Sequence, residues 1–473
     1  MITDRPTAHI TPTRGWLNDA NGLVHWRGRH HVFHQSGPDA VAGGMKSWGH
    51  LSSDDLFNWQ RHPIALEPSQ AADRDGCWSG CIVDDHGVAT AIYTGVVTLG
   101  DGLFKQVVCL ATATDDDLLM WEKDPANPVE VDQPGFTVEA FRDPYVWNDG
   151  DQWCMVLGTG MPDGQGAVLL YRSGDLRHWR FESVLLSEDE LPESALWTGA
   201  VWECPAFAVL PSGDALLLFS VFDPSSSSLH YTVAVVGSFE GAHFTPTSVR
   251  RLDHGHDFYA AALEKTDDGR VLAYGWSWEA LSAEGRQQQG WAGCLTFPRE
   301  LSAQEGSLTV ALARELRDAG QVVTTLEMTQ VSPGQPLELV NPRSARIDAA
   351  LQLDRTSSVR LAFCRSPKSQ EQITLDYAAD TGKVLVDRSA SSVLDEASGG
   401  SSTADYVLPS DGRLDLTIVI DHTIVEILLG GSVAFTERVH PQDANAEHLR
   451  IESLAMPITL LKLTVARLTR LFG

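Results

Sequence analysis

The first two thirds of the chain consist of short runs in which apolar and polar positions alternate and which turn back at a glycine. Two such runs joined by a polar turn predict a β-hairpin. The clearest turns are centred on Gly28, Gly87, Gly150, Gly213 and Gly269. These glycines are 59, 63, 63 and 56 residues apart. A hairpin in every unit of this length is typical of a radial repeat, so the pattern predicts a five-bladed β-propeller.

A second repeat has the pattern Asp-Leu-x-x-Trp and occurs at residues 55–59, 117–121 and 175–179. The three copies lie about one hairpin period apart, which disfavours recurrence by chance. We expect each copy to form the outer turn of a blade, with the tryptophan packed between neighbouring blades. These tryptophans are therefore assigned no part in a functional site.

The pattern changes after residue 331, where alternating strands are separated by polar turns. This arrangement is typical of an antiparallel β-sandwich, and a length of 473 residues also favours two domains. The sequence thus predicts an all-β chain, with a five-bladed β-propeller at residues 1–318 followed by a β-sandwich at residues 331–473. Residues 317–321 are the expected joint, and the polar residues 389–406 are expected to form a surface loop.

The charge balance narrows the range of partners. The formal net charge is −28, from 63 acidic and 35 basic residues, and it repels phosphate backbones and anionic lipids. No apolar run is long enough to span a membrane, and the first residues lack the apolar core of a secretion signal. We therefore expect no nucleic-acid partner, no membrane partner and a cytoplasmic location, and we leave the oligomeric state open.

The cysteines and histidines do not indicate a metal site. Seven cysteines are an odd number, which fits free thiols in a reducing compartment better than a disulfide framework. Cys77 and Cys81 lie four residues apart, but no second pair follows at zinc-finger spacing. The histidine-rich residues 29–35 and 254–257 are more simply explained as hydrogen-bonded structural histidines. We expect no metal and no cofactor.

An acidic or polar residue stands before each of the hairpins. These residues are Asp19, Ser79, Asp143, Glu203 and Asp257. Because the innermost strands of a propeller begin around a common axis, the repeat should gather these side chains in one pocket. Each has another explanation, since Asn-Asp and Asp-Pro pairs are common in turns and Glu203 could lie at an exposed strand end. Several buried carboxylates near one axis nevertheless indicate a function, because a buried carboxylate is costly unless it is paired.

Two carboxyl groups that face each other across a glycosidic bond are the minimum machinery of glycoside hydrolysis. One attacks the sugar or activates water, the other protonates the leaving oxygen, and a third carboxylate can hold sugar hydroxyls. Burial and repulsion between like charges should raise one pKa, and Glu203 is the expected acid. Asp19, if neighbouring donors hydrogen-bond to it, should stay ionised as the nucleophile.

Three motifs around these residues are WLNDANG at Asp19, FRDP at Asp143 and ECP at Glu203. Further segments are FHQ (33–35), WGHLSSDDLFNW from Trp48, CWSG (77–80), DFYA (257–260), GWSW from Gly275 and GWAGCLTFPREL from Gly290. Over essentially its whole length the chain resembles glycoside hydrolase family 32, the β-fructofuranosidases that include invertases, inulinases and levanases.

The resemblance implies a role for each carboxylate. Asp19 would attack the anomeric carbon of a terminal fructosyl unit and form a covalent fructosyl-enzyme. Glu203 would protonate the leaving oxygen and then deprotonate water, so that the anomeric configuration is retained. Asp143 would accept hydrogen bonds from ring hydroxyls, and Arg142 would orient Asp143 and the sugar.

Further residues match positions that shape the fructose pocket of the family. These are Asn18, Gln35, Trp48, Trp78, Ser79 and Trp276, with Tyr259 and Asp257 as weaker candidates. The tryptophans could instead be core aromatics, the two amides could be structural, and Arg142 could be only an ion-pair partner. The chain also departs from the family at Ala20, where proline is usual, and we expect a less rigid turn after the nucleophile.

The expected substrate is a small fructoside, and the expected reaction is hydrolysis of the terminal fructosyl bond of sucrose or a short fructo-oligosaccharide. A fructosyltransferase that uses the same covalent intermediate, a hydrolase of phosphorylated sucrose and a non-catalytic sugar-binding homologue remain alternatives. An inverting five-bladed hydrolase of arabinan or xylan would also carry three acids, but the motifs favour the fructose enzymes. The sandwich resembles the accessory domain of the family, and we expect it to contribute structurally and to hold no catalytic residue.

Overall fold

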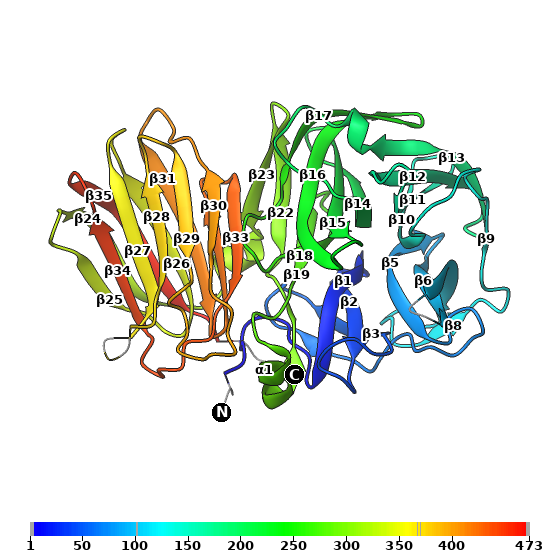
Figure 1. The fold of residues 1–473 in the computed structure, drawn as a ribbon, viewed down its shortest axis with the longest axis horizontal. Coiled ribbons are helices and arrows are strands. Elements are labelled where there is room, and N and C mark those ends of the chain that lie inside the picture. Colours follow the sequence, from blue (N-terminus) through cyan, green and yellow to red (C-terminus); the bar gives the residue numbers. More distant parts are fainter. Residues whose placement is uncertain (1–3, 101–102, 367, 369, 470–473) are drawn as a thin grey trace.

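The computed structural model describes residues 4–100, 103–366, 368 and 370–469, and it contains two β-domains that lie side by side (Figure 1). The ends of the two predicted domains, residues 1–3 and 470–473, lie outside these ranges. In Figure 1 the N-terminal domain runs from blue to green, and the C-terminal domain runs from yellow to red. The prediction of an all-β chain with a propeller followed by a sandwich is confirmed.

The N-terminal domain consists of five sheets, one for each predicted hairpin, and the four main strands of each sheet are antiparallel. The four successive strands of each blade are β1 (Gly15–Trp26), β2 (Arg29–Gly37), β3 (Ser47–Ser53) and β4 (Gln60–Arg61); β5 (Gly76–Asp85), β6 (Val88–Gly100), β7 (Leu103–Ala113) and β8 (Trp121–Lys123); β10 (Arg142–Asn148), β11 (Trp153–Gly160), β12 (Gly166–Ser173) and β13 (His178–Ser187); β14 (Val201–Val209), β15 (Ala215–Asp223), β16 (Ser228–Glu240) and β17 (His243–Arg251); β18 (Tyr259–Lys265), β19 (Val271–Ser277), β22 (Arg299–Gln304) and β23 (Ser307–Leu312). The short β9 (Glu130–Val131) pairs with β13.

The five predicted turn glycines lie between the first and second strands of their blades. Their φ angles are +80°, +90°, +110°, +92° and +82° in chain order. A side chain on this left-handed backbone would be strained, which explains why each hairpin turns at glycine.

The ring closes between the last blade and the first. The short strand β20 (Trp291–Ala292) pairs in parallel with β1, and β21 (Cys294–Leu295) pairs with β19. An isolated bridge joins Ile10 to Leu295. Two short helices, α1 (Ala283–Gln289) and α2 (Arg314–Arg317), are the only α-helices in the described part of the chain, and neither is long enough to span a membrane.

The Asp-Leu-x-x-Trp repeat forms the turn between the third and fourth strands of the first three blades, as predicted. Its leucine has a φ angle of 60°, 58° or 64°, and the tryptophan Nε1 donates to the carbonyl oxygen of that leucine over 3.1, 2.9 or 2.9 Å. In the second copy the turn amides are bound by Asp115, whose Oδ1 accepts from the backbone N of Asp117 at 2.9 Å. The left-handed backbone conformation of the leucine is strained, and the hydrogen bond from the indole N–H stabilises the turn.

Each innermost strand shifts register close to its start. The shifts lie between Leu17 and Ala20, Trp78 and Gly80, Arg142 and Tyr145, Glu203 and Ala206, and Tyr259 and Ala262. A β-bulge of this kind leaves residues unpaired and redirects their side chains. The five bulges lie at the candidate motifs, so the repeat interrupts its own hydrogen-bond ladder at the same place in every blade.

The C-terminal domain packs two six-stranded sheets face to face, with the strand orders β24-β35-β26-β31-β32-β33 and β25-β34-β27-β28-β29-β30. These strands are β24 (Gln321–Val331), β25 (Leu337–Val340), β26 (Ser344–Gln352), β27 (Ser358–Arg365), β28 (Ile373–Ala378), β29 (Lys383–Asp387), β30 (Ser401–Asp405), β31 (Arg413–Asp421), β32 (Ile424–Leu429), β33 (Val433–Arg438), β34 (His448–Ser453) and β35 (Ile458–Arg467). Strand β24 lies before residue 331, where the sandwich was expected to begin, and pairs with β35.

The prediction of a surface loop over residues 389–406 was wrong in part, because residues 401–405 form β30 at the edge of a sheet. The segment before β30 contacts the propeller: the backbone N of Ser282 donates to Glu396, and that of Ser398 donates to Ala280, each over 2.8 Å. This polar segment therefore forms part of the interface between the two domains and is not only a solvent-exposed loop.

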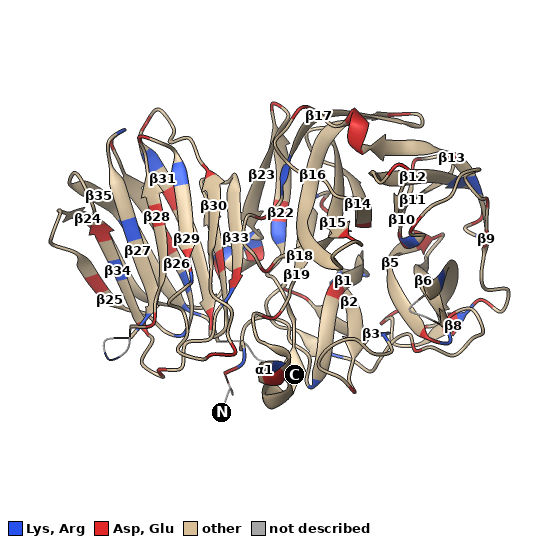
Figure 2. Ribbon diagram, in the orientation of Figure 1, with Lys and Arg blue, Asp and Glu red and all other residues tan. Residues whose placement is uncertain are grey.

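Buried ion pairs connect the two domains, and charged positions colour the facing strands β22 and β33 in Figure 2. Arg299 of the propeller is 1% exposed; its guanidinium reaches Asp253 at 2.6 Å and Glu426 of the sandwich at 2.7 Å. Arg438 of the sandwich reaches Glu279 of the propeller at 2.8 Å. Charges buried at this depth need their partners, so the two domains hold each other in place.

Candidate active site

A cavity of about 280 Å³ lies where the five innermost strands of the propeller begin. Figure 2 shows charged positions on β1, β10 and β14 around this end of the propeller axis. The cavity is lined by Trp16, Asn18, Asp19, Gln35, Lys46, Trp78, Arg142, Asp143, Glu203, Cys204, Leu229, Tyr259 and Trp276. The structure thus brings together the three candidate carboxylates and most of the residues predicted around them.

The bulges aim the carboxylates at the cavity. Asp19 and Asp143 lie among the unpaired residues of their bulges, and Glu203 is the last paired residue before the bulge of β14. Asp143 has a φ angle of 60°, and its backbone N donates to Thr94 Oγ1 of the preceding blade at 2.8 Å. A non-glycine residue held in this region of φ is strained, and such strain is concentrated at functional sites.

Asp19 is surrounded by donors. Its Oδ1 accepts from Asn18 Nδ2 at 3.0 Å, and its Oδ2 accepts from Gln35 Nε2 at 3.2 Å and from Ser79 Oγ at 2.7 Å. Asn18 also donates to Gln35 Oε1 at 3.2 Å, so the two amides are held relative to each other. The carboxylate of Asp19 is therefore fixed by three side chains that the sequence analysis had selected.

Burial raises the pKa of Asp19, while the positive charge of Lys46 and the hydrogen bond from Ser79 act in the opposite direction. The negative charge of Glu203 raises the pKa further. The donors around Asp19 thus offset only part of the cost of burial, and the pKa of Asp19 remains above its ordinary value.

Asp143 is 6% exposed and accepts from the backbone N of Cys204 at 3.0 Å. Burial raises the pKa of Asp143 to about 7, opposed by the charge of Arg142 and assisted by Glu203 and Asp19. From the sequence, the raised pKa is expected at Glu203. Burial and the crowding of carboxylates together raise the pKa of both Asp143 and Asp19.

Glu203 is held on both carboxylate oxygens. Its Oε1 forms an ion pair with Arg142, and its Oε2 accepts from Tyr259 Oη at 2.6 Å. Arg142 also lies 3.8 Å from Asp143, measured from Nε to Oδ2. Arg142 therefore bridges the candidate acid and the candidate stabilising carboxylate, and Tyr259 fixes the orientation of the acid.

Aromatic side chains form the walls of the cavity. Trp276 is 5% exposed, and its ring centre lies 5.6 Å from that of Trp16. Trp78 lines the cavity, whereas Trp48 is fully buried and donates from Nε1 to the carbonyl oxygen of Trp78 at 2.9 Å. Trp48 thus lies behind the wall and does not reach the cavity.

Asp257 does not lie in the cavity, which corrects its weaker assignment to the pocket. It is fully buried beside the sandwich, where it accepts from the backbone N of Arg438 at 2.7 Å and lies 2.8 Å from His256 Nδ1. Asp257 precedes β18, whereas the bulge residues of the other blades lie within their strands. The phase of the repeat alone did not reveal this offset.

Four lining residues were not assigned to the site from the sequence: Trp16, Lys46, Cys204 and Leu229. Trp16 and Cys204 lie inside recognised motifs, and Cys204 Sγ is 3.6 Å from both Asp19 Oδ2 and Asp143 Oδ2. Lys46 and Leu229 carry no signal of their own in the sequence, because they reach the cavity from the segment before β3 and from β16.

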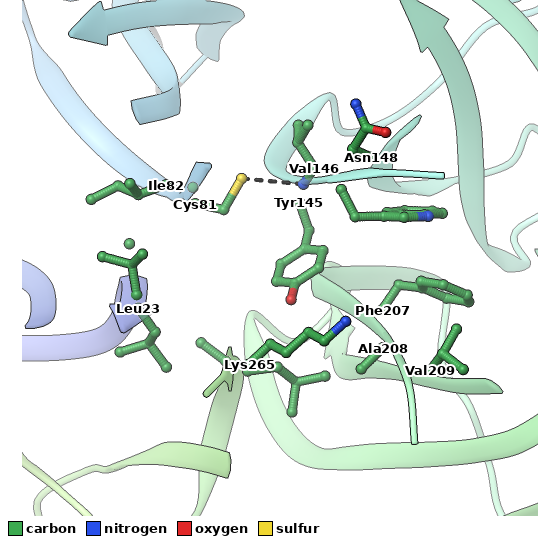
Figure 3. Close-up of a pocket in the computed structure, with 16 residues that line it drawn as sticks. Leu23, Cys81, Ile82, Tyr145, Val146, Asn148, Phe207, Ala208, Val209 and Lys265 are labelled. Atoms are coloured by element: carbon green, nitrogen blue, oxygen red, sulfur yellow. Dashed lines mark hydrogen bonds between the residues drawn. The ribbon is translucent and has the colours of Figure 1, made fainter. Parts of the chain in front are cut away.

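A second cavity, of about 260 Å³, lies farther along the same five strands (Figure 3). Its lining includes Leu23, Ile82, Val146, Phe207 and Leu263, and it contains no Asp or Glu among the described residues. In Figure 3 the hydroxyl group of Tyr145 points toward Lys265. This cavity offers no pair of acid and base, so the carboxylate cavity is the candidate active site.

All seven cysteines are free in the described structure, and six of them are buried. No group of three or more His, Cys, Asp or Glu side chains within the described ranges is arranged to hold a metal ion.

Comparison with known proteins supports the resemblance noted from the motifs. The Glycosyl hydrolases family 32 N-terminal domain matches residues 9–311, and the Glycosyl hydrolases family 32 C terminal domain matches residues 313–466. A sucrose-6-phosphate hydrolase of Zymomonas mobilis is 33% identical over 92% of this chain and 87% of the relative. A raffinose invertase of Escherichia coli is 32% identical over 92% of this chain and 90% of the relative.

Solved structures show the same architecture. A β-fructofuranosidase of Bombyx mori superposes with a TM-score of 0.80 at 28% identity and covers 98% of this chain and 94% of its own. A fructan 1-exohydrolase of Cichorium intybus superposes with a TM-score of 0.86 at 24% identity, over 99% of this chain and 98% of its own. The two domain matches together span nearly the whole chain, and the protein therefore belongs to glycosyl hydrolase family 32 and is a glycosidase.

Proposed function

We propose that this protein is a retaining β-fructofuranosidase that hydrolyses the terminal fructosyl bond of sucrose or a short fructo-oligosaccharide. The observation that carries the proposal is the pair of carboxyl groups in one cavity, Asp19 held by three donors and Glu203 held by Arg142 and Tyr259. A Bombyx mori relative has been solved as a mutant in complex with sucrose, which supports a small fructoside as substrate.

In the first step a carboxylate oxygen of Asp19 attacks the anomeric carbon of the fructosyl unit. The bond from that carbon to the leaving sugar breaks, and its electron pair goes to the glycosidic oxygen. Protonated Glu203 gives its proton to this oxygen, so that the leaving sugar departs as a neutral alcohol. The product is a fructosyl ester of Asp19.

In the second step water attacks the same carbon and the ester bond to Asp19 breaks. Glu203, now a carboxylate, takes the proton of the water. Two displacements at one carbon retain its configuration. The same carboxyl group must release and accept a proton, and the contacts from Arg142 and Tyr259 keep it in one position for both steps.

Asp143 would accept hydrogen bonds from fructose hydroxyls while positive charge develops on the ring. Its carboxylate is oriented by the backbone N of Cys204 at 3.0 Å and lies 3.8 Å from the Arg142 guanidinium. Asn18, Gln35 and Ser79 would position Asp19, and Trp78 and Trp276 would contact the sugar faces.

We also propose that the enzyme acts in the cytoplasm. Seven cysteines without a disulfide in the described structure fit a reducing compartment.

The test is a time course of free glucose and free fructose after the purified protein is mixed with sucrose, with Asp19→Ala measured alongside. Equal release of both sugars that is abolished in Asp19→Ala would support hydrolysis through the proposed nucleophile. Glucose that runs ahead of fructose would instead indicate fructosyl transfer to a second sugar. No release from sucrose or from any short fructoside would contradict the proposal and favour a sugar-binding homologue.

A further inference from the structure

The second cavity, shown in Figure 3, has no part in the reaction described above. Its volume is about 260 Å³, whereas protein interiors leave few voids larger than a water molecule. Its walls include Leu23, Ile82, Val146, Phe207 and Leu263, which are between 2% and 7% exposed. An apolar cavity of this kind favours an apolar ligand over water.

A constriction separates the second cavity from the carboxylates. The two cavities share no lining residue among those described. A void of about 20 Å³ lies between them, because it shares Asp143 and Cys204 with the carboxylate cavity and Gly80 and Tyr145 with the second cavity. A space of this size holds a single water molecule and does not let a sugar pass. A ligand of the second cavity would therefore bind independently of the fructoside.

Two polar groups face each other in this otherwise apolar cavity. Lys265 is exposed at its mouth, Tyr145 is half-buried, and in Figure 3 the Tyr145 hydroxyl group points toward Lys265. Neither Lys265 Nζ nor Tyr145 Oη has a hydrogen-bond or ion-pair partner within the described part of the chain. Glu264, the acid next to Lys265 in the sequence, is engaged elsewhere, 2.5 Å from His30 Nδ1. An ammonium group and a phenol are thus both available to one ligand.

We propose that the second cavity binds a small monocarboxylate with an apolar chain. The carboxylate would accept hydrogen bonds from the Lys265 ammonium group and the Tyr145 hydroxyl group, and the chain would lie against side chains such as Leu263 and Phe207.

Both the charge and the size of the cavity fit this class of ligand. One ammonium group balances one carboxylate, whereas a phosphate dianion would leave a negative charge uncompensated in a protein whose net charge is already −28. Pockets for drug-sized ligands measure about 300–1,000 Å³, so this smaller cavity suits an aliphatic acid of about eight carbons.

Isothermal titration calorimetry with octanoate measures the binding. The wild type should bind one octanoate per chain. Octanamide, which has the same chain and a neutral head, should bind about tenfold more weakly. Acetate, which lacks the chain, should show no binding at the same concentrations. Added salt should weaken the binding of octanoate and leave that of octanamide unchanged.

Variants test the head and the chain of the ligand separately. Lys265→Met should weaken octanoate binding by about tenfold and make it equal to octanamide binding, and Lys265→Arg should keep most of the affinity. Lys462→Met, which removes an exposed lysine of the sandwich, is the matched control and should bind octanoate as the wild type does. Ala208→Leu places a larger side chain in the cavity wall and should weaken octanoate and octanamide alike, by about tenfold or more.

The possible outcomes are distinct. No saturable binding of octanoate to the wild type would overturn the proposal, and so would an affinity that Lys265→Met leaves unchanged. Thermal unfolding without ligand should show that Ala208→Leu is folded; unchanged affinity in the folded variant would place the ligand outside the cavity. Lys265 is exposed, so its replacement leaves the core intact and tests the proposal even if Ala208→Leu does not fold.

The activity assay provides an independent check. Saturating octanoate should leave the KM for sucrose unchanged, because nothing larger than water fits between the two cavities. A KM that rises with the octanoate concentration would place the ligand among the carboxylates and overturn the proposal. Calorimetry needs no catalytic turnover, so the binding result stands even if the function proposed above fails.

Discussion

Two cavities open along the axis of one propeller, and the same five strands contribute to both. Their volumes are similar, about 280 and 260 Å³. One gathers three carboxyl groups and two cations, whereas the other is lined mainly by apolar side chains, with Lys265 as its one charged residue among those described. Size and position on the axis therefore do not identify the active site; the side chains supplied by each end of the strands do.

The bulges mark the boundary between the two cavities. Residues at or before a bulge, such as Asp19 and Glu203, face the carboxylate cavity, and residues beyond it, such as Leu23 and Phe207, line the second cavity. Past this bulge the ladders of β5, β10, β14 and β18 are regular, whereas β1 shifts register again between Asn21 and Val24. The residues at the bulges supply the chemistry of the carboxylate cavity, and the residues beyond them pack the interior of the propeller.

The largest expected effect is at the nucleophile. Asp19→Ala removes the group that forms the covalent intermediate and should lower kcat for sucrose by about 10⁴-fold or more. Thermal unfolding should show that the variant is folded. Asp116→Ala, which removes a surface carboxyl group that is 79% exposed, is the matched control and should keep full activity. More than a tenth of wild-type activity in Asp19→Ala would contradict the assignment.

Glu203→Gln should lower kcat for sucrose by about 10²- to 10⁴-fold, because the leaving oxygen no longer receives a proton. The loss in the first step should be much smaller for a fructoside whose leaving group is a nitrophenol, since such a group departs as an anion. Burst kinetics with the nitrophenyl substrate would measure this difference. An equal loss of the first step with both substrates would indicate that Glu203 has a structural role only.

The second cavity should respond in stability and not in activity. Phe207 is 2% exposed, and its ring stacks on Trp147 with 4.3 Å between the ring centres. Phe207→Ala should lower the free energy of unfolding by about 3–5 kcal/mol, as expected for a large aromatic side chain removed from a core. Urea denaturation measures this change, and kcat of the folded variant should stay within about twofold of the wild type. Val209→Ala at the same mouth, where Val209 is 51% exposed, should change stability little.

The smallest expected effect is a pH-dependent change in stability at Asp143. Its pKa of about 7 in the folded protein lies above the ordinary value of 3.8, so the folded state binds an extra proton between these two values. The free energy of unfolding should therefore fall as the pH rises through this window. Asp143→Asn removes the dependence, and its Tm relative to the wild type should be higher at pH 8 than at pH 5, by about 2–6 °C. An equal Tm difference at both pH values would contradict the raised pKa.

The sequence predicted the features that repeat. One period relates the turn glycines such as Gly28, the carboxylates before the hairpins and the Asp-Leu-x-x-Trp turns. In a propeller, residues that are one period apart occupy equivalent positions in neighbouring blades around the axis. Of the two residues that the sequence misplaced, Trp48 is not part of the repeat, and Asp257 is part of it but is offset from its strand. Trp48 shares a motif with the pocket but lies behind Trp78, and Asp257 stands before its strand and contacts the sandwich.

Features that depend on contacts between distant segments could not be predicted from the sequence. Lys46 reaches the rim from outside the repeat, and the pKa of Asp143 depends on Arg142, Glu203 and Asp19 together. Strand β24 was not predicted as part of the sandwich. Most of its residues are exposed, so its sequence lacks the alternation of apolar and polar positions that marked the other strands. The burial of a side chain and the charges around it depend on segments that are distant in the sequence, so they can be determined only from the folded structure.

The segment that precedes the nucleophile strand is held by the sandwich. The backbone N atoms of Ala8 and His9 donate to Asp421 Oδ2 at 2.7 and 2.9 Å, and His9 Nε2 lies 3.0 Å from Glu426. A recombination event that replaced the sandwich with an unrelated domain would release this segment and leave Arg299 and Asp253 without Glu426. The two domains therefore depend on each other, and replacing the sandwich should destabilise the propeller beside the nucleophile strand as well.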